Sequence, residues 1–137
     1  MPDNLDTTIP NSLKALSSFM NEVDRFLAPT DLETKIKKHV SIILEEALSN
    51  IINYGYDDDK EHTIDVRMAI GEDEVALRIE DDGKPFNPLT VPRLDKSQPP
   101  LERKKGGLGI HLVRNLMRSM TYSWRDGKNI FEIWVKR

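Results

Sequence analysis

The chain has 137 residues, which fits one compact domain (1–137), and its 20 basic and 23 acidic residues give a formal net charge of −3. That balance argues against nucleic acid or an anionic membrane as the main partner. No cysteine is present, which excludes disulfide and thiolate chemistry and suits a reducing, cytoplasmic location. No apolar run approaches the ~18 residues of a membrane span, and the N-terminus lacks an apolar signal segment, so we expect no membrane insertion.

The N-terminal stretch predicts a strand and then a helix. Residues 4–10, "NLDTTIP", are short and apolar at Leu5 and Ile9, as in an edge strand. Asn11 or Ser12 then caps a helix. The helical period of three or four residues is carried by Leu13, Leu16, Met20, Val23 and Leu27.

A second helix follows almost at once. Thr30 and Glu33 have the spacing of a capping box, which predicts a start at Thr30, and Gly55 is a natural stop. Its apolar stripe consists of Ile36, Val40, Ile43, Ala47, Ile51 and Tyr54.

The apolar period then changes to two. Residues 64–70 and 75–80 predict an antiparallel hairpin with one buried face, and residues 122–125 and 130–135 predict a second hairpin that turns through "DGKN". Between the hairpins, residues 81–105 show no period and contain five prolines, which is typical of a functional lid or of disorder.

After this stretch, "GGLGIHLVRNLMRSM" predicts a glycine turn and a helix. The residues predicted to face inward are Ile110, Val113, Leu116 or Met117, and Met120. Two helices, a hairpin, a lid, a helix and a hairpin indicate an α+β fold. We expect a two-layer α/β sandwich, with helices on one face of a mostly antiparallel, mixed sheet.

The second helix carries an acid and an amide beside its apolar stripe, in "LEEALSNIINYGYDDD". With Ala47 at the centre and ~100° per residue, Glu46 lies near −100° and Asn50 near −60°. Both side chains therefore line one edge of the buried face, where a pocket is possible, whereas Glu45 points away. The spacing alone also fits a solvated helix edge, because Glu-x-x-x-Asn is a weak pattern.

Two further stretches carry chemistry of their own. Asp81, Asp82 and Gly83 stand where a strand ends, so a carboxylate there could accept a hydrogen bond from an amino group, although Asp-Gly also fits a plain turn. Three glycines at 106, 107 and 109 open a helix, which suits a phosphate cradle or a hinge. The context of these glycines matches neither a Walker A loop nor a dinucleotide fingerprint.

Taken in order, these stretches resemble the N, G1 and G2 boxes of the GHKL ATPase superfamily, which has the Bergerat fold. The resemblance spans about Thr7 to Arg137 and is closest to the stand-alone anti-sigma-factor serine/threonine kinases of the RsbW and SpoIIAB type. "EEALSNIINYGY", "DDGKPFNP" and "GGLGIHLVRNLM" are all similar to that subgroup.

The resemblance implies roles for two residues of the second helix. Glu46 matches the glutamate that acts as general base toward a hydroxyl attacking the γ-phosphate. Asn50 matches the amide that holds Mg²⁺ next to the nucleotide. One amide is chemically sufficient, because Mg²⁺ takes most of its ligands from water and phosphate.

The remaining implied roles concern ATP or ADP. Asp81 matches the adenine-binding aspartate, and Gly83 matches the glycine that lets the ring approach. The phosphate turn corresponds to Gly107, Leu108 and Gly109. Many relatives have a second glycine where this chain has Pro85, which stiffens the start of the implied ATP lid at about 84–105.

The resemblance implies an ATP-dependent protein serine/threonine kinase that works as a homodimer. Its substrate would be an anti-sigma-factor antagonist of the STAS type, and its second partner would be a sigma factor. A different class also fits: a nucleotide-sensing module that sequesters a partner without phosphoryl transfer. Both need ATP, but only the kinase needs Glu46 as a base.

Overall fold

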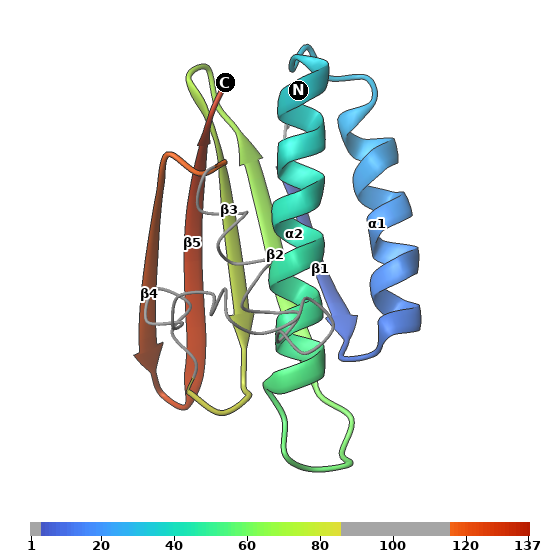
Figure 1. Cartoon of the computed structure of the whole chain (residues 1–137), viewed down its shortest axis with the longest axis vertical. Coiled ribbons are helices and arrows are strands. Elements are labelled where there is room, and N and C mark those ends of the chain that lie inside the picture. Colours follow the sequence, from blue (N-terminus) through green and yellow to red (C-terminus); the bar gives the residue numbers. More distant parts are fainter. Residues whose placement is uncertain (1–3, 86–115) are drawn as a thin grey trace, which may run out of the picture.

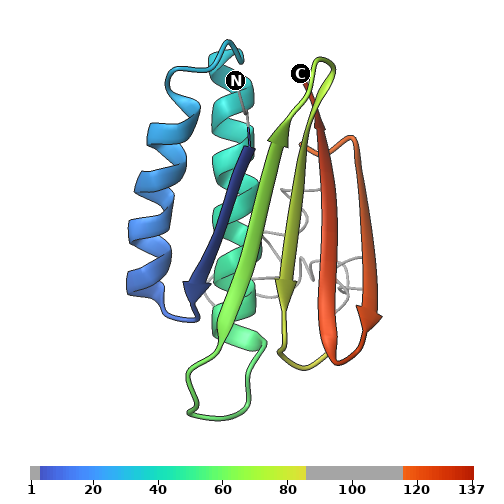
Figure 2. The same ribbon diagram turned by 180° about the vertical axis from the view of Figure 1, so that it is seen from behind.

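The computed structural model describes residues 4–85 and 116–137. One antiparallel sheet has the strand order β1-β2-β3-β5-β4. Its strands are β1 (Asn4–Pro10), β2 (Thr63–Ile70), β3 (Glu74–Asp81), β5 (Lys128–Lys136) and β4 (Ser119–Arg125). Helices α1 (Leu13–Leu27) and α2 (Thr34–Tyr54) lie on one face of this sheet (Figures 1 and 2). The α+β sandwich is confirmed, but every pairing among the described strands is antiparallel, so the sheet is not mixed there.

The core lies between the sheet and the two helices. β2 and β3 alternate between buried and more exposed residues, as the period of two predicts. The inward side chains of these strands are Ile64, Val66, Met68, Val75, Leu77 and Ile79. Each fully buried aliphatic side chain contributes roughly 1.5–3 kcal/mol, so this layer fixes how α2 lies on the sheet. No helix in the described ranges is long and apolar enough to cross a membrane.

The start of α1 resolves the choice between two capping residues. The Ser12 hydroxyl accepts a hydrogen bond from the Ala15 N–H at 3.1 Å, so Ser12 is the N-cap. Asn11 instead pairs with His62: its N–H donates to the His62 carbonyl, and its Oδ1 accepts from the His62 N–H, both at 3.0 Å. This pair extends the β1–β2 ladder, in which β1 is an edge strand as predicted.

The predicted capping box at the start of α2 is wrong. The helix begins at Thr34, and its N-cap Glu33 makes no side-chain capping hydrogen bond within the described chain. The Thr30 hydroxyl donates to the Leu27 carbonyl at 2.6 Å and so satisfies the end of α1. Because the link between the helices is short, Thr30 hydrogen-bonds to the end of α1 and does not cap α2.

The buried face of α2 is wider than the predicted stripe. Leu44 and Leu48 are fully buried, whereas Tyr54 is 44% exposed and Ala47 is only partly buried. The helix contacts both α1 and the sheet, so it needs apolar residues on two sides. As a result Asn50 lies within the buried face, at 4% exposure, and not at its edge.

Both predicted hairpins are present. β4 and β5 are joined by Asp126 and Gly127, with φ of 52° and 77°, which is typical of the two-residue turn that Asp-Gly favours. The predicted helix does not extend to Met120, because β4 begins at Ser119 and Met120 pairs with Ile133. The earlier part of that predicted helix lies outside the described residues.

Candidate functional site

Asp81 is a carboxylate buried at the end of β3, with 3% of its surface exposed. Its Oδ1 accepts hydrogen bonds from the Gly83 N–H at 2.8 Å and from the Asn129 side-chain amide at 3.1 Å. Its Oδ2 is buried and has no hydrogen-bond partner within the described chain. Burial raises the pKa of Asp81, and the hydrogen bonds from Asn129 and Gly83 oppose that rise. An acceptor left open in this way fits a ligand that donates a hydrogen bond.

Gly83 is required by a close backbone contact. A Cβ at this position would lie 2.5 Å from the Gly55 carbonyl oxygen, which is too close for any other residue without a backbone shift. The next residue, Lys84, donates its N–H to the same carbonyl at 2.8 Å. The resemblance implies that this glycine admits an adenine ring, whereas the contact seen in the described structure is with the C-cap of α2. The ends of β3 and α2 are therefore held together.

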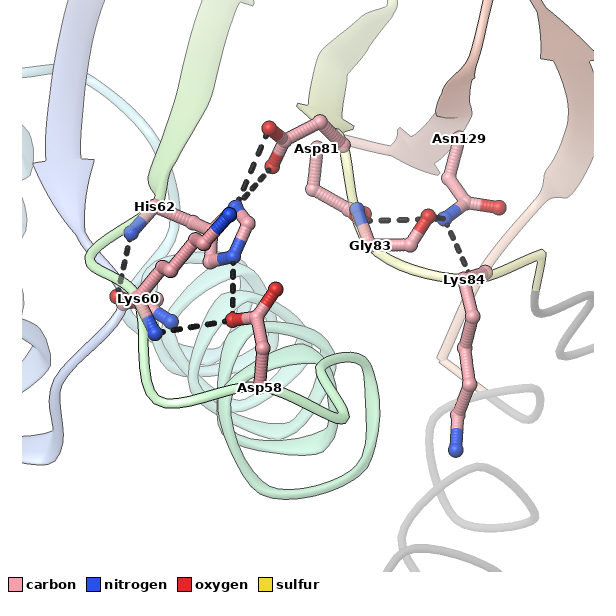
Figure 3. A network of polar contacts seen from close by, with 9 residues as sticks. Asp58, Lys60, His62, Asp81, Gly83, Lys84 and Asn129 are labelled. Carbon is pink, nitrogen blue, oxygen red and sulfur yellow. Dashed lines mark hydrogen bonds and ion pairs between the residues drawn. The ribbon is translucent and has the colours of Figure 1, made fainter.

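Asn129 is a site residue that the sequence analysis missed. It lies opposite Asp81 in the β3–β5 register and is 2% exposed. Besides Asp81, its side-chain amide donates to the Lys84 carbonyl at 2.9 Å, and its Oδ1 accepts from the Tyr122 hydroxyl at 2.5 Å. Figure 3 shows Asp81, Gly83 and Lys84 gathered beside Asn129. In the sequence Asn129 is the last residue of the predicted turn "DGKN", and that position gives no indication of its partner strand.

On α2, the predicted acid and amide differ in burial. Asn50 is buried, and its Nδ2 has no hydrogen-bond partner among the described residues. Glu46 is half-buried and Glu45 is exposed, as the helical projection predicted. At ~1.5 Å per residue, Asn50 and Glu46 lie roughly 8 Å and 14 Å along the helix from Gly55. Both side chains therefore lie toward the N-terminus of α2 from the point where the helix meets the end of β3.

Two predicted parts of the site, the phosphate turn and most of the lid, lie outside the described residues. They comprise Gly107, Leu108 and Gly109 and residues 86–105. At the start of that lid the structure describes Lys84 and Pro85. Lys84 is held by its backbone contact with Gly55 and by an ion pair with Asp57 at 3.0 Å.

The described side chains fit an adenine nucleotide in two respects. The open Oδ2 of Asp81 suits an exocyclic amine. The unpaired atom of Asn50 is its Nδ2, a donor that suits a phosphate oxygen, and the amide oxygen of the same side chain is the atom type that a hard cation takes as a ligand. Within residues 4–85 and 116–137, no group of three or more histidine or acidic side chains could hold a metal by itself. A Mg²⁺ ion at Asn50 would therefore take its other ligands from water and phosphate, as Mg²⁺ commonly does.

Comparison with known proteins identifies the family. Residues 9–134 match the histidine kinase-like ATPase domain family, and because the match covers most of the chain, the protein belongs to that family.

Among individual relatives, an anti-sigma F factor of Clostridium perfringens is 31% identical over 107 residues, which are 76% of this chain and 75% of the relative. An anti-sigma F factor of Oceanobacillus iheyensis is 33% identical over 77% of this chain and 68% of its own. The serine/threonine-protein kinase BtrW of Bordetella bronchiseptica is 30% identical over 69% of this chain and 67% of its own.

Two solved structures share the fold at low sequence identity. The RsbU and RsbW domains of a Mycobacterium tuberculosis protein align with a TM-score of 0.65 and 14% identity, over 98% of this chain and 33% of that one. The SiaB-SiaC complex of Pseudomonas aeruginosa aligns with a TM-score of 0.63 and 16% identity, over 97% of this chain and 89% of that one. At these identities the likeness concerns the fold alone.

Proposed function

We propose that this protein is an ATP-dependent protein serine/threonine kinase that also holds a regulatory protein partner. The observation that carries the proposal is the buried Asp81, whose Oδ2 has no partner in the described chain. Leaving such an acceptor unpaired costs about 1–3 kcal/mol, and a ligand amine would recover that cost on binding. Membership of an ATPase domain family supports adenine as the ligand.

In this proposal, the β3 end binds the base of the nucleotide. Asp81 Oδ2 accepts a hydrogen bond from the adenine amino group, while Asn129 and Gly83 hold Oδ1 in place. Gly83 keeps the chain pressed against Gly55, so the carboxylate has a fixed position relative to α2. Phosphate binding is assigned to Gly107, Leu108 and Gly109 on the strength of the sequence resemblance.

The chemical step is assigned to α2. Glu46 accepts the proton of a substrate hydroxyl as the hydroxyl oxygen forms a bond to the γ-phosphorus of ATP. The bond from that phosphorus to the ADP oxygen breaks in the same step. Asn50 would hold a Mg²⁺ ion through its amide oxygen, and the ion would offset the charge of the phosphates when bound. A half-buried position suits a base, because the carboxylate is partly desolvated.

The names of the relatives support the choice of partners. Because relatives of this chain are called anti-sigma F factor and serine/threonine-protein kinase, we propose a sigma factor as the sequestered partner. The phosphoryl acceptor in this proposal is an anti-sigma-factor antagonist of the STAS type, and the active unit is a homodimer. The competing function is a nucleotide-sensing module that sequesters its partner without phosphoryl transfer.

Calorimetry with ATP and ADP tests the nucleotide site directly. The folded protein should bind both nucleotides at micromolar to millimolar concentrations, and Mg²⁺ should tighten binding. The guanine base of GTP has a carbonyl where adenine has an amine, so the carbonyl oxygen would face the Asp81 carboxylate. GTP should therefore bind at least about tenfold more weakly than ATP. Absence of adenine-nucleotide binding at millimolar concentration would remove the basis of the proposal.

A further inference from the structure

His62 lies between two carboxylates directly before β2. Its Nε2 is 2.8 Å from Asp58 Oδ1, and its Nδ1 is 3.1 and 3.2 Å from the two carboxylate oxygens of Asp82. The ring stacks on Tyr56, with centroids 4.4 Å apart and planes 21° apart, and only 16% of the side chain is exposed. Figure 3 shows the imidazole and Asp58 facing each other. The imidazole is therefore held by contacts on both nitrogens and on one face.

This arrangement has a definite protonation requirement. Ionised carboxylates only accept hydrogen bonds, and a neutral imidazole donates from one nitrogen only. Both contacts are therefore hydrogen bonds only when His62 is an imidazolium cation. The hydrogen bonds with Asp58 and then Asp82 raise the pKa of His62 above its usual value, and the bond to His62 lowers the pKa of Asp58.

The two carboxylates belong to the two segments that frame the candidate site. Asp82 stands between Asp81 and Gly83, and Asp58 lies just beyond the end of α2. The same segments are joined by the Lys84 N–H to Gly55 carbonyl bond and by the Lys84–Asp57 ion pair. The His62 cation is a third link between the β3 end and the α2 end.

The charged groups around His62 come from each neighbouring segment. Asp58 and Lys60 belong to the α2–β2 loop, where the Lys60 N–H donates to Asp58 Oδ1 at 3.0 Å. Asp82 comes from the β3 end, the stacked Tyr56 is uncharged at neutral pH, and the β1–α1 turn contributes the uncharged Asn11. Loss of the proton would leave two carboxylates facing one neutral ring, and one of them would lose its donor.

We propose that His62 is a positioning residue for the nucleotide site, and that its protonated form strengthens nucleotide binding by holding Asp82 against the α2 end. Through its backbone neighbours, Asp82 then fixes Asp81 and Gly83, to which the adenine ring is assigned. The inference rests on the proposed nucleotide function and adds pH control to it.

The sign of the effect follows from the direction of the pKa change. A raised pKa in the folded protein means that the link is complete below about pH 6.5, the ordinary value for histidine, and is lost as pH rises through the raised pKa. The lowered pKa of Asp58 keeps that carboxylate charged over the same range. Nucleotide affinity should therefore be highest near pH 6 and lower near pH 9, at both of which Asp58 stays ionised.

The test is the dissociation constant of Mg·ADP measured by calorimetry from about pH 6 to pH 9 for three proteins. Wild-type affinity should fall about threefold to tenfold across this range. In His62→Gln the corresponding fall should be largely absent, because the amide cannot change its charge. Titration of the nucleotide itself affects all three proteins alike. His39→Gln, which removes a histidine roughly 24 Å along α2 from Gly55, is the matched control and should follow the wild type.

An NMR titration of the wild type provides a second measurement that does not need the variant to fold. Because coupling is reciprocal, saturating Mg·ADP should raise the pKa of the His62 imidazole. If ADP binds but leaves that pKa unchanged, or if His62→Gln and wild type share one pH dependence, the inference is wrong and the nucleotide site stands. If the folded wild type binds no ADP at any pH, the proposed function fails, and the inference fails with it.

Discussion

Asp81 combines burial, a raised pKa and an open hydrogen-bond acceptor in one side chain. A carboxylate in that position is unfavourable for the folded protein alone, because desolvation is only partly offset by Asn129 and Gly83. Because the pKa of Asp81 is raised in the folded protein, its ionisation lowers the free energy of unfolding as pH rises through that raised pKa. A buried carboxylate with such a cost is typical of a side chain that binds a ligand.

Replacing Asp81 with asparagine should separate ligand binding from stability. The amide oxygen can take the place of Oδ1 toward Gly83 and Asn129, and the amide NH₂ then occupies the Oδ2 position as a donor. Facing an adenine amine, that donor should weaken ATP and ADP binding about ten- to hundredfold. The melting temperature without nucleotide should stay equal or rise by a few degrees. Unchanged affinity in calorimetry would show that Asp81 is only a turn residue.

For single residues, the sequence predicted where a side chain lies in its own helix or strand better than it predicted which residues that side chain contacts. Asp81 and Gly83 stand where the end of an alternating strand places them, whereas the helical projection put Asn50 at the edge of the buried face and the structure places it within that face. Asn129 and His62 could not be found in this way, because their partners come from strand pairing and loop packing far along the chain. Nothing in local spacing specifies that β3 pairs with β5.

Among the elements, α2 and β3 form the frame of the site. Their ends meet where Gly83 passes the Gly55 carbonyl, and this contact joins the helix that carries Glu46 and Asn50 to the strand that ends at Asp81. The regular parts of these elements were predictable from their apolar periods. The start of α2 was not, because Thr30 fits a capping box yet bonds to the end of α1.

Gly83→Ala tests the contact between these elements. The added methyl would lie 2.5 Å from backbone, so the β3 end or the α2 end must shift. We expect the free energy of unfolding to drop by about 1–3 kcal/mol in urea denaturation, with weaker nucleotide binding. Lys84→Ala is the control: it removes an exposed ion pair but keeps the backbone bond to Gly55, so it should cost under about 1 kcal/mol. Equal stability of Gly83→Ala and wild type would mean that the contact is loose.

For the whole molecule, the two-layer architecture explains why a site can form on the helix face of the sheet. β3 and β5 lie in the middle of the sheet, and α2 brings its buried amide to the same face through a shared core. The order of two helices and two hairpins indicated this fold class in advance. The strand order could not be predicted from the chain alone, because β4 forms the far edge although it precedes β5.

The central claim is that the molecule transfers phosphate with Glu46 as base, and one rate comparison tests it most directly. Phosphoryl transfer from Mg·ATP to a protein partner captured from the native cell should be measured for wild type, Glu46→Gln and Glu45→Gln. Loss of the proton acceptor should slow Glu46→Gln by about 10²–10⁴ while nucleotide and partner affinity stay the same. The exposed Glu45 should tolerate the same change. A wild-type rate in Glu46→Gln, or no transfer by the wild type to a partner it binds, would contradict the account.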